Sequence, residues 1–212
     1  MLKKLKPKML LTSLIILLPI VIGLILWDRL PDQLVTHWDA KGVPNGWSSK
    51  PFAVIGLPFF LLAVHWICMI GTAADPKAQN HSEKILTLVL WICPATSLFC
   101  QSAILTEGLG TPLPIANIGS CFVGLVFIIV GNYLPKCKQN YTIGIKIPWT
   151  LNSTENWNHT HRFAGPLWVF AGILIMILCL MDLMTLAVPV MFIMILLPIF
   201  YSYWYYRKYD RK

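Results

Sequence analysis

Residues 167–206 read LWVFAGILIMILCLMDLMTLAVPVMFIMILLPIFYSYWYY and contain one charged residue, Asp182. At the rise of an α-helix this stretch would be about 60 Å long, roughly twice the thickness of the hydrocarbon core of a bilayer. Hydrophobic residues on every side of a helix indicate burial in a membrane or in a large core. We therefore predict two membrane-spanning helices here, joined by a tight turn at residues 182–185.

Four further apolar stretches precede this pair, at residues 9–27, 52–72, 85–107 and 114–133. Each is close to the roughly 20 residues that one helical crossing needs. The basic residues before the first stretch also fit a signal peptide. However, the apolar run is long and no small-residue cleavage site follows it, which favours a retained anchor. The sequence thus predicts an all-α membrane protein with six transmembrane helices, forming a single integral membrane domain over residues 1–212.

The composition supports this class. Hydrophobic residues make up 57% of the 212 residues and charged residues only 12%, against about 25% charged residues in an average soluble domain. A water-soluble enzyme of ordinary composition is therefore excluded. A disordered chain is excluded as well, because disordered chains are poor in apolar residues.

The distribution of the 17 lysines and arginines predicts the orientation. If the N-terminus is cytoplasmic, only Arg29, Lys41 and Lys50 fall in outer segments. Short cytoplasmic loops of membrane proteins carry an excess of Lys and Arg, so we expect both termini in the cytoplasm of a bacterial cell. The net charge of +8 then reflects topology and contact with membrane lipids, and direct binding of nucleic acid is not expected.

No pattern in the chain indicates catalysis, a metal or a cofactor. Five cysteines lie within predicted spans and Cys137 lies in an inner loop, so we expect no disulfide. His159 and His161 are two residues apart and would point in different directions on a helix. Phosphate-binding loops, zinc-binding helices and serine elbows are missing from the sequence. His65 lies alone within the second span, where a functional role and a neutral, hydrogen-bonded histidine both remain open.

The outer loop, residues 28–51, contains LPDQLVTHWDAKGVPNGWSSKP and is unusually rich in turn-forming and aromatic residues. The pairs Val43-Pro44 and Asn45-Gly46 favour a tight turn. Alternation would place His37, Asp39 and Lys41 on one side of an extended segment. We expect a small structured loop that either binds a ligand or anchors the span ends. The candidate ligand-facing residues are His37, Trp38, Asp39, Lys41, Trp47 and Lys50.

The inner loop, residues 131–165, reads GNYLPKCKQNYTIGIKIPWTLNSTENWNHTHRFAG. Ser153 or Thr154 can cap a helix that runs from about Glu155 into the fifth span. The dense pattern of this structured loop suggests either a docking surface or a segment folded against the helices, with Asn and Thr side chains satisfying backbone groups. The candidate residues are Asn132, Lys138, Asn140, Gly144, Lys146, Pro148, Trp149, Thr150, Trp157 and His161.

This inner loop resembles the signature of the sporulation-delaying-protein immunity family of bacterial membrane proteins. The matching elements include the Gly-Asn pair at 131–132, the segment GIKIPWTL at 144–151 and the Thr-His pair at 160–161. One departure is Lys146, where the family usually has Arg; lysine keeps the charge but loses the planar fork used for bidentate contacts. The outer loop resembles the small uncharacterised domain that often precedes this signature.

The resemblance implies a multi-pass protein of the bacterial cell membrane that gives immunity to a secreted, membrane-active toxin peptide. It also implies a signalling role, in which the protein holds a small winged-helix repressor at the membrane. An alternative is a small transporter or channel for a peptide or an ion. In that case His65, Gln101, Asn117 and the prolines within the spans would line a path between helices.

Overall fold

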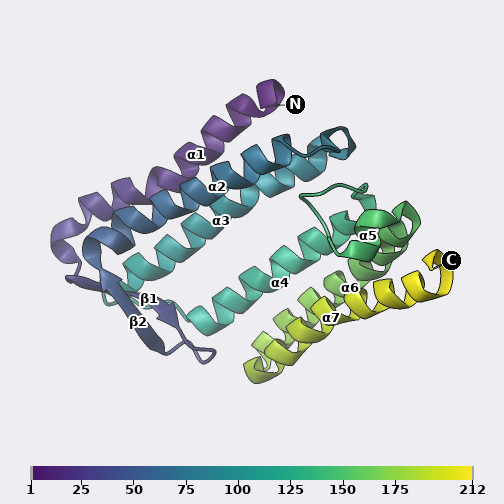
Figure 1. The fold of residues 1–212 in the computed structure, drawn as a ribbon. Coiled ribbons are helices and arrows are strands. Elements are labelled where there is room, and N and C mark those ends of the chain that lie inside the picture. The colour runs from purple at the N-terminus through teal and green to yellow at the C-terminus, as the bar shows by residue number, and fades with distance from the viewer. Residues whose placement is uncertain (1, 212) are drawn as a thin grey trace. The chain divides into compact units, whose positions relative to one another are not determined.

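The computed structural model describes residues 2–211. Six of its helices are long and apolar enough to cross a membrane (Figure 1). They are α1 (Leu2–Ile25), α2 (Leu57–Ala73), α3 (Glu83–Gly108), α4 (Ile115–Tyr133), α6 (Thr154–Leu180) and α7 (Ala187–Tyr205). The prediction of an all-α, multi-pass membrane protein is therefore confirmed for the described chain.

Several shorter elements lie between these helices. A single pair of antiparallel strands, β1 (Gln33–Trp38) and β2 (Pro44–Ser49), follows α1, and the short helix α5 (Pro148–Asn152) precedes α6. Single turns of 3₁₀ or π helix occupy Trp27–Arg29, Phe52–Gly56, Ala78–Asn80, Leu134–Lys136, Met184–Leu186 and Tyr206–Asp210.

The chain forms two compact units. Unit 1 contains the residues up to Ala73 together with Leu86–Ile115, and unit 2 contains Ala74–Ile85 together with the chain from Ala116 onward. Unit 1 therefore holds the hairpin of β1 and β2, and unit 2 holds the whole of the inner loop that carries the sequence signature.

The hairpin in unit 1 is fixed to the helices by apolar side chains at its base. Leu30 and Leu34 are buried against Val54 from the turn that leads into α2 and against Ile104 from α3. A Cβ atom added to Gly108 of α3 would come within 2.4 Å of the Leu34 side chain. Burial of one leucine side chain is worth about 1.5–3 kcal/mol, so these contacts hold the base of the hairpin while its tip projects.

The turn of the hairpin lies earlier than the sequence suggests. The pairs Val43-Pro44 and Asn45-Gly46 together predict a tight turn, but Pro44, Asn45 and Gly46 lie within β2, and the chain reverses over residues 39–43. Asp39 accounts for the difference, because its Oδ1 accepts hydrogen bonds from the backbone N–H groups of Lys41 (2.8 Å) and Val43 (2.9 Å). Asp39 and Lys41 therefore belong to the turn and do not share one face of a strand with His37.

Two polar side chains of the spans are buried within unit 1. Nε2 of His65 lies 3.0 Å from Oγ1 of Thr12 on α1, which agrees with the hydrogen-bonded reading of this histidine. Gln101 of α3 donates from Nε2 to the carbonyl oxygen of Ala53 at 2.8 Å. Both side chains thus join neighbouring helices, as polar groups in membrane helices commonly do.

In unit 2 the fifth span begins where its cap predicts. Ser153 is the N-cap of α6, and its Oγ accepts a hydrogen bond from the backbone N–H of Asn156 at 3.2 Å. The helix continues without a break to Leu180. The chain then turns through Asp182, whose φ of 56° lies in the left-handed region, and enters α7. The predicted turn between the last two spans is therefore confirmed.

Candidate functional site

The signature loop folds on itself around Asn140. This side chain is 1% exposed. Its amide nitrogen donates to the carbonyl oxygens of Lys138 (2.8 Å) and Ile143 (2.9 Å), and its Oδ1 accepts from the N–H groups of Thr142 (2.9 Å) and Ile143 (2.6 Å). One asparagine thus satisfies four backbone groups of an irregular segment, which stabilises the segment without regular secondary structure.

His161 ties this loop to α6. Its Nε2 accepts a hydrogen bond from the backbone N–H of Ile145 at 3.0 Å, and its Nδ1 lies 2.8 Å from the carbonyl oxygen of Trp157. An acceptor at Nε2 and a donor at Nδ1 define the neutral imidazole with its proton on Nδ1. The ring stacks on that of Trp157 at a centroid distance of 4.1 Å, so the histidine is a structural clamp between loop and helix.

The position of Gly144 is set by the same pair of rings. Its φ of 123° is one that side chains rarely adopt. A Cβ atom there would lie 2.6 Å from Nε2 of His161 and 3.0 Å from the ring of Trp157. Glycine is therefore required twice over, by the backbone conformation and by the close approach of the clamp.

Trp157 and Thr150 complete the buried part of the loop. Nε1 of Trp157 donates to the carbonyl oxygen of Cys137 at 2.7 Å. Oγ1 of Thr150 donates to the carbonyl oxygen of Ile145 (2.7 Å) and accepts from the N–H of Ile147 (3.1 Å). Burial raises the pKa of Cys137 to about 11, in spite of an opposing hydrogen bond from Asn140, so this thiol stays protonated and is a poor nucleophile.

A second segment, residues 74–82, is bound to the loop through Asp75. Oδ2 of Asp75 accepts hydrogen bonds from the N–H of Tyr141 (2.9 Å) and from Oγ1 of Thr142 (2.8 Å). The imidazole of His81 lies 3.3 Å from the same oxygen. Burial raises the pKa of the Asp75 carboxyl, but the hydrogen bonds from Lys77, Thr142 and Tyr141 and the charge of His81 outweigh it and hold the pKa below its ordinary value.

Asp75 is a site residue that the sequence analysis missed. Its partners Tyr141 and Thr142 lie 66 and 67 residues away in the chain, and no local pattern links the two segments. Two more hydrogen bonds join this segment to Gln139. Lys77 donates from Nζ to the Gln139 side chain, and Asn80 donates from Nδ2 to the backbone carbonyl oxygen of Gln139 at 2.7 Å. The Asp-Pro pair at 75–76 would have indicated a turn, but not its partner.

Other signature residues lie nearer the surface, and among them Trp149 packs its ring against those of Tyr203 (5.0 Å between centroids) and Tyr206 (6.2 Å). Asn132, Lys138, Lys146 and Pro148 are exposed, and Trp149 is half-buried. Lys146 donates from Nζ to the carbonyl oxygen of Thr142 at 2.9 Å, a bond that a single ammonium makes as well as a guanidinium. The signature thus divides into a buried set that holds the loop and an exposed set that remains available for a partner.

The six candidate ligand-facing residues of the outer loop also include both supporting and accessible side chains. His37, Asp39, Lys41 and Trp47 are exposed, and Trp47 keeps 56% of its surface accessible. Trp38 packs against the apolar base of the hairpin. Lys50 lies 3.4 Å from the carboxylate of Asp32 and donates to the carbonyl oxygen of Trp27 at 3.3 Å. Trp38 and Lys50 therefore support the hairpin, and the other four side chains are accessible.

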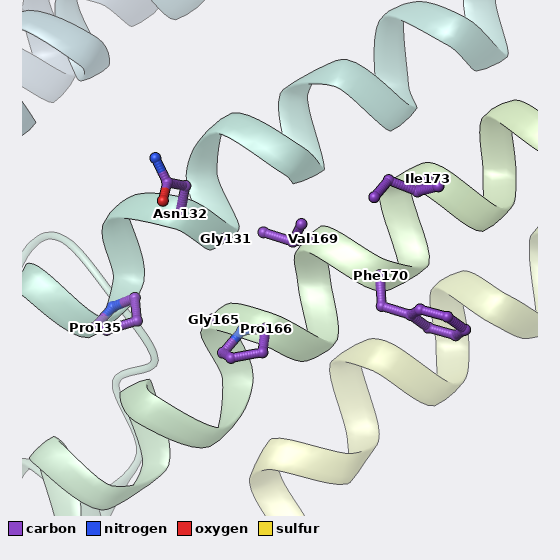
Figure 2. A pocket seen from close by; sticks show the side chains of 8 residues that line it. All are labelled: Gly131, Asn132, Pro135, Gly165, Pro166, Val169, Phe170 and Ile173. Carbon is purple, nitrogen blue, oxygen red and sulfur yellow. The ribbon is translucent and has the colours of Figure 1, made fainter.

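Unit 2 also contains two close crossings of α4 and α6 at glycines. A Cβ atom on Gly131 would lie 2.8 Å from the carbonyl oxygen of Gly165, and one on Gly172 would lie 2.5 Å from that of Gly124. Small residues at such contacts let membrane helices approach closely. Beside the Gly131–Gly165 crossing lies a groove of about 370 Å³, shown with its lining residues in Figure 2.

Two family models match stretches of the chain that include the outer loop and most of the inner loop. Residues 136–202 match the family model of the SdpI/YfhL protein family, and residues 14–62 match that of a domain of unknown function, DUF1648. The Immunity protein SdpI of Bacillus subtilis (strain 168) is 25% identical over 204 residues, which cover 95% of this chain and 97% of that protein. No solved structure matches the chain.

These matches agree with the resemblance of both loops and with the six apolar helices. The family match includes the clamp of Trp157 and His161, and the second match includes the whole hairpin. The chain is accordingly a multi-pass protein of the bacterial cell membrane that is similar, over residues 136–202, to the SdpI/YfhL protein family.

Proposed function

We propose that this protein protects the cell that makes it from a secreted, membrane-active toxin peptide, and that the hairpin of β1 and β2 is the part that meets the peptide. The observation that supports this most directly is the accessible surface of the hairpin, to which Trp47, His37, Asp39 and Lys41 contribute exposed side chains. An aromatic ring and three polar side chains are presented there on a base that is rigidly packed. Sites that bind partners typically combine such anchors with a preorganised frame.

The chemistry of these exposed hairpin side chains suits an amphipathic peptide. Trp47 and Val43 leave 56% and 54% of their surfaces exposed, and both offer apolar area to the apolar side of a peptide. His37, whose Nδ1 lies 2.5 Å from Oδ1 of Asn45, and Lys41 offer polar contacts beside them. A tryptophan close to the membrane surface is also well placed to engage a ligand that is itself partitioning into the bilayer.

A second part of the proposal concerns signalling to a small winged-helix repressor. Two basic side chains of the signature loop, Lys138 and Lys146, are exposed. Helix α2 follows the hairpin after the π-helical turn Phe52–Gly56 and ends at Ala73. Two residues later, the carboxylate of Asp75 accepts hydrogen bonds from Tyr141 and Thr142. Peptide binding that favours one position of α2 would therefore alter the signature loop through this contact.

Protection is tested with toxin-sensitive cells that express either the parent chain or Trp47→Ala. The cells are challenged with the secreted peptide fraction of the strain that encodes the chain. We expect the parent chain to protect the cells. Cells that express Trp47→Ala should be killed at about a tenfold lower peptide dose than cells that express the parent, which corresponds to a loss of about 1.4 kcal/mol in binding free energy. Trp204→Ala is the matched control, because Trp204 is 50% exposed but lies in α7, far from the hairpin in sequence.

Amounts of each variant in the membrane are compared by immunoblot. Equal protection by the parent and Trp47→Ala would rule out the hairpin as the peptide-binding part, and unchanged killing with the parent would rule out immunity. For the signalling part, we expect the peptide to increase retention of a purified winged-helix repressor on membranes that contain the parent. The double variant Lys138→Glu, Lys146→Glu should remove that increase without loss of protection.

A further inference from the structure

The groove between α4 and α6 has an almost entirely apolar lining within the membrane-spanning part of unit 2. Its lining residues are Gly131, Asn132, Pro135, Gly165, Pro166, Val169, Phe170 and Ile173. Phe170 and Ile173 keep 65% and 45% of their surfaces exposed. An exposed apolar surface of this kind favours contact with an apolar ligand. The side chains along the length of the groove indicate the chemical class of that ligand.

One end of the groove carries a cation. Arg162 precedes Pro166, Val169 and Ile173 by four, seven and eleven residues, so all four lie on one face of α6. The Arg162 side chain is exposed, and no hydrogen bond or ion pair joins it to another described residue. Glu155, the nearest acid on this face, lies two helical turns farther from the groove, about 10 Å along the axis.

The position of Arg162 along α6 matches the edge of a bilayer. The helix ends at Leu180, which is 18 residues beyond Arg162 and therefore about 27 Å along the axis, close to the thickness of the hydrocarbon core. From Arg162 to Ile173 the distance along the axis is about 16 Å. The groove thus runs from the membrane surface to about the bilayer midplane, which is the depth of one leaflet.

An amide lies between the cation and the apolar part. Asn132 is exposed on α4, its side chain has no hydrogen-bond partner among residues 2–211, and it is one of the residues that line the groove, with its amide directed away from α6 in Figure 2. Its neighbour Gly131 packs against Gly165 and Val169, so Asn132 lies about one helical turn deeper than Arg162. An amide without a partner at this depth is costly unless a polar group of a ligand meets it.

We propose that this groove is a binding site for one anionic phospholipid of the leaflet on the Arg162 side. The lipid phosphate lies at the Arg162 guanidinium, an ester carbonyl accepts a hydrogen bond from the Asn132 amide, and one acyl chain lies along Val169, Phe170 and Ile173. The order of cation, amide and apolar surface along the groove repeats the order of phosphate, ester and acyl chain in the lipid.

The test uses the full chain extracted from vesicles that contain equal amounts of phosphatidylglycerol and phosphatidylcholine with the same acyl chains. Lipids that remain bound are counted by native mass spectrometry. We expect the parent to retain phosphatidylglycerol at least fivefold over phosphatidylcholine. Arg162→Gln should reduce retained phosphatidylglycerol about tenfold, and Ile173→Trp, which fills the groove, should reduce both lipids.

Arg207→Gln is the matched control, because it removes the same charge from another exposed arginine that does not lie on this face of α6. Thermal unfolding confirms that each variant is folded. Equal retention of phosphatidylglycerol by the parent and Arg162→Gln overturns the proposal, and so does an equal loss in Arg207→Gln. A dimer of the parent that dissociates in Ile173→Trp, with lipid retention unchanged, would also overturn it and assign the groove to a second copy.

Discussion

At the scale of single residues, the signature loop depends on side chains that hydrogen-bond to backbone. Asn140, Thr150 and His161 together satisfy N–H and carbonyl groups of a segment that has little regular structure. Each unsatisfied buried group would cost roughly 1–3 kcal/mol. The density of Asn, Thr and His in the signature is therefore a consequence of how the loop folds, and the exposed lysines are free to serve another purpose.

The first prediction concerns Gly144. In Gly144→Ala the new methyl group must displace His161 or Trp157, and the backbone keeps an unfavourable φ. We expect a loss of about 2–4 kcal/mol in the free energy of unfolding, from backbone strain and overpacking together. Thermal unfolding in detergent micelles measures it.

Gly110→Ala separates the two causes. Gly110 has a φ of 74°, but a Cβ atom there would meet no heavy atom within 4 Å. This control should lose only the backbone part, about 1 kcal/mol. If both variants lost the same amount, the clamp of Trp157 and His161 would not be the tight contact that the structure shows.

The second prediction concerns the pH dependence that Asp75 contributes. Because the folded pKa of Asp75 is lowered, the folded state holds its proton less tightly than the unfolded state, whose pKa is about 3.9. The contribution to stability is therefore complete above that value and is lost as the pH falls below it, through the folded pKa. Asp75→Asn should be less stable than the parent at pH 7, and the difference should shrink at pH 3.

Unfolding of both proteins in detergent at pH 7 and pH 3 provides the measurement. Asp28→Asn serves as the control, since Asp28 is exposed and makes no comparable set of bonds. A difference between parent and Asp75→Asn that stayed constant over this range would show that the negative charge of Asp75 does not stabilise the contact with Tyr141 and Thr142.

At the scale of elements, the sequence predicts what local patterns determine and fails where distant residues decide. The spans, the Ser153 cap and the turn near Asp182 follow from hydrophobicity and capping over a few residues. The sequence predicts the hairpin turn too late in the chain, because the Asn-Gly pair is a strong turn signal. Asp39 instead stabilises an earlier turn. Asn45 and Gly46 lie in β2, because this strand pairs with β1 from Pro44 onward.

The glycines of α4 and α6 illustrate a second limit. Gly124, Gly131, Gly165 and Gly172 are spaced seven residues apart on each helix, and the two pairs meet. One sequence shows that a helix has a small-residue stripe, but it does not show which other helix covers the stripe. The pairing of α4 with α6 therefore emerges only from the structure, and so does the groove beside it.

The third prediction tests that pairing. In Gly172→Ala the added Cβ would lie 2.5 Å from the carbonyl oxygen of Gly124, so α4 and α6 must move apart. We expect a loss of about 1–3 kcal/mol in stability, measured by thermal unfolding in micelles.

Gly71→Ala is the control for this change. It adds the same methyl group to α2, where nothing lies within 4 Å, and alanine is the better helix former by about 1 kcal/mol. Unchanged or raised stability is expected. A variant Gly172→Ala as stable as Gly71→Ala would contradict the close crossing of the two helices.

At the scale of the whole molecule, the central claim is that one polypeptide presents a structured hairpin outside the cell and a structured signature loop inside it. The immunity and signalling proposals both require this arrangement. It follows from six spans and from the placement of all but three lysines and arginines in the predicted inner segments. Both segments that matter carry exposed lysines, Lys41 and Lys146, which can be replaced without disturbing a buried contact.

The most direct test is labelling of Lys41→Cys and Lys146→Cys by a membrane-impermeant maleimide, in intact cells and after permeabilisation, with the parent chain as background. The account predicts that Lys41→Cys is labelled in intact cells and that Lys146→Cys is labelled only after permeabilisation. Labelling of Lys146→Cys in intact cells, or protection of Lys41→Cys until the membrane is opened, would contradict it.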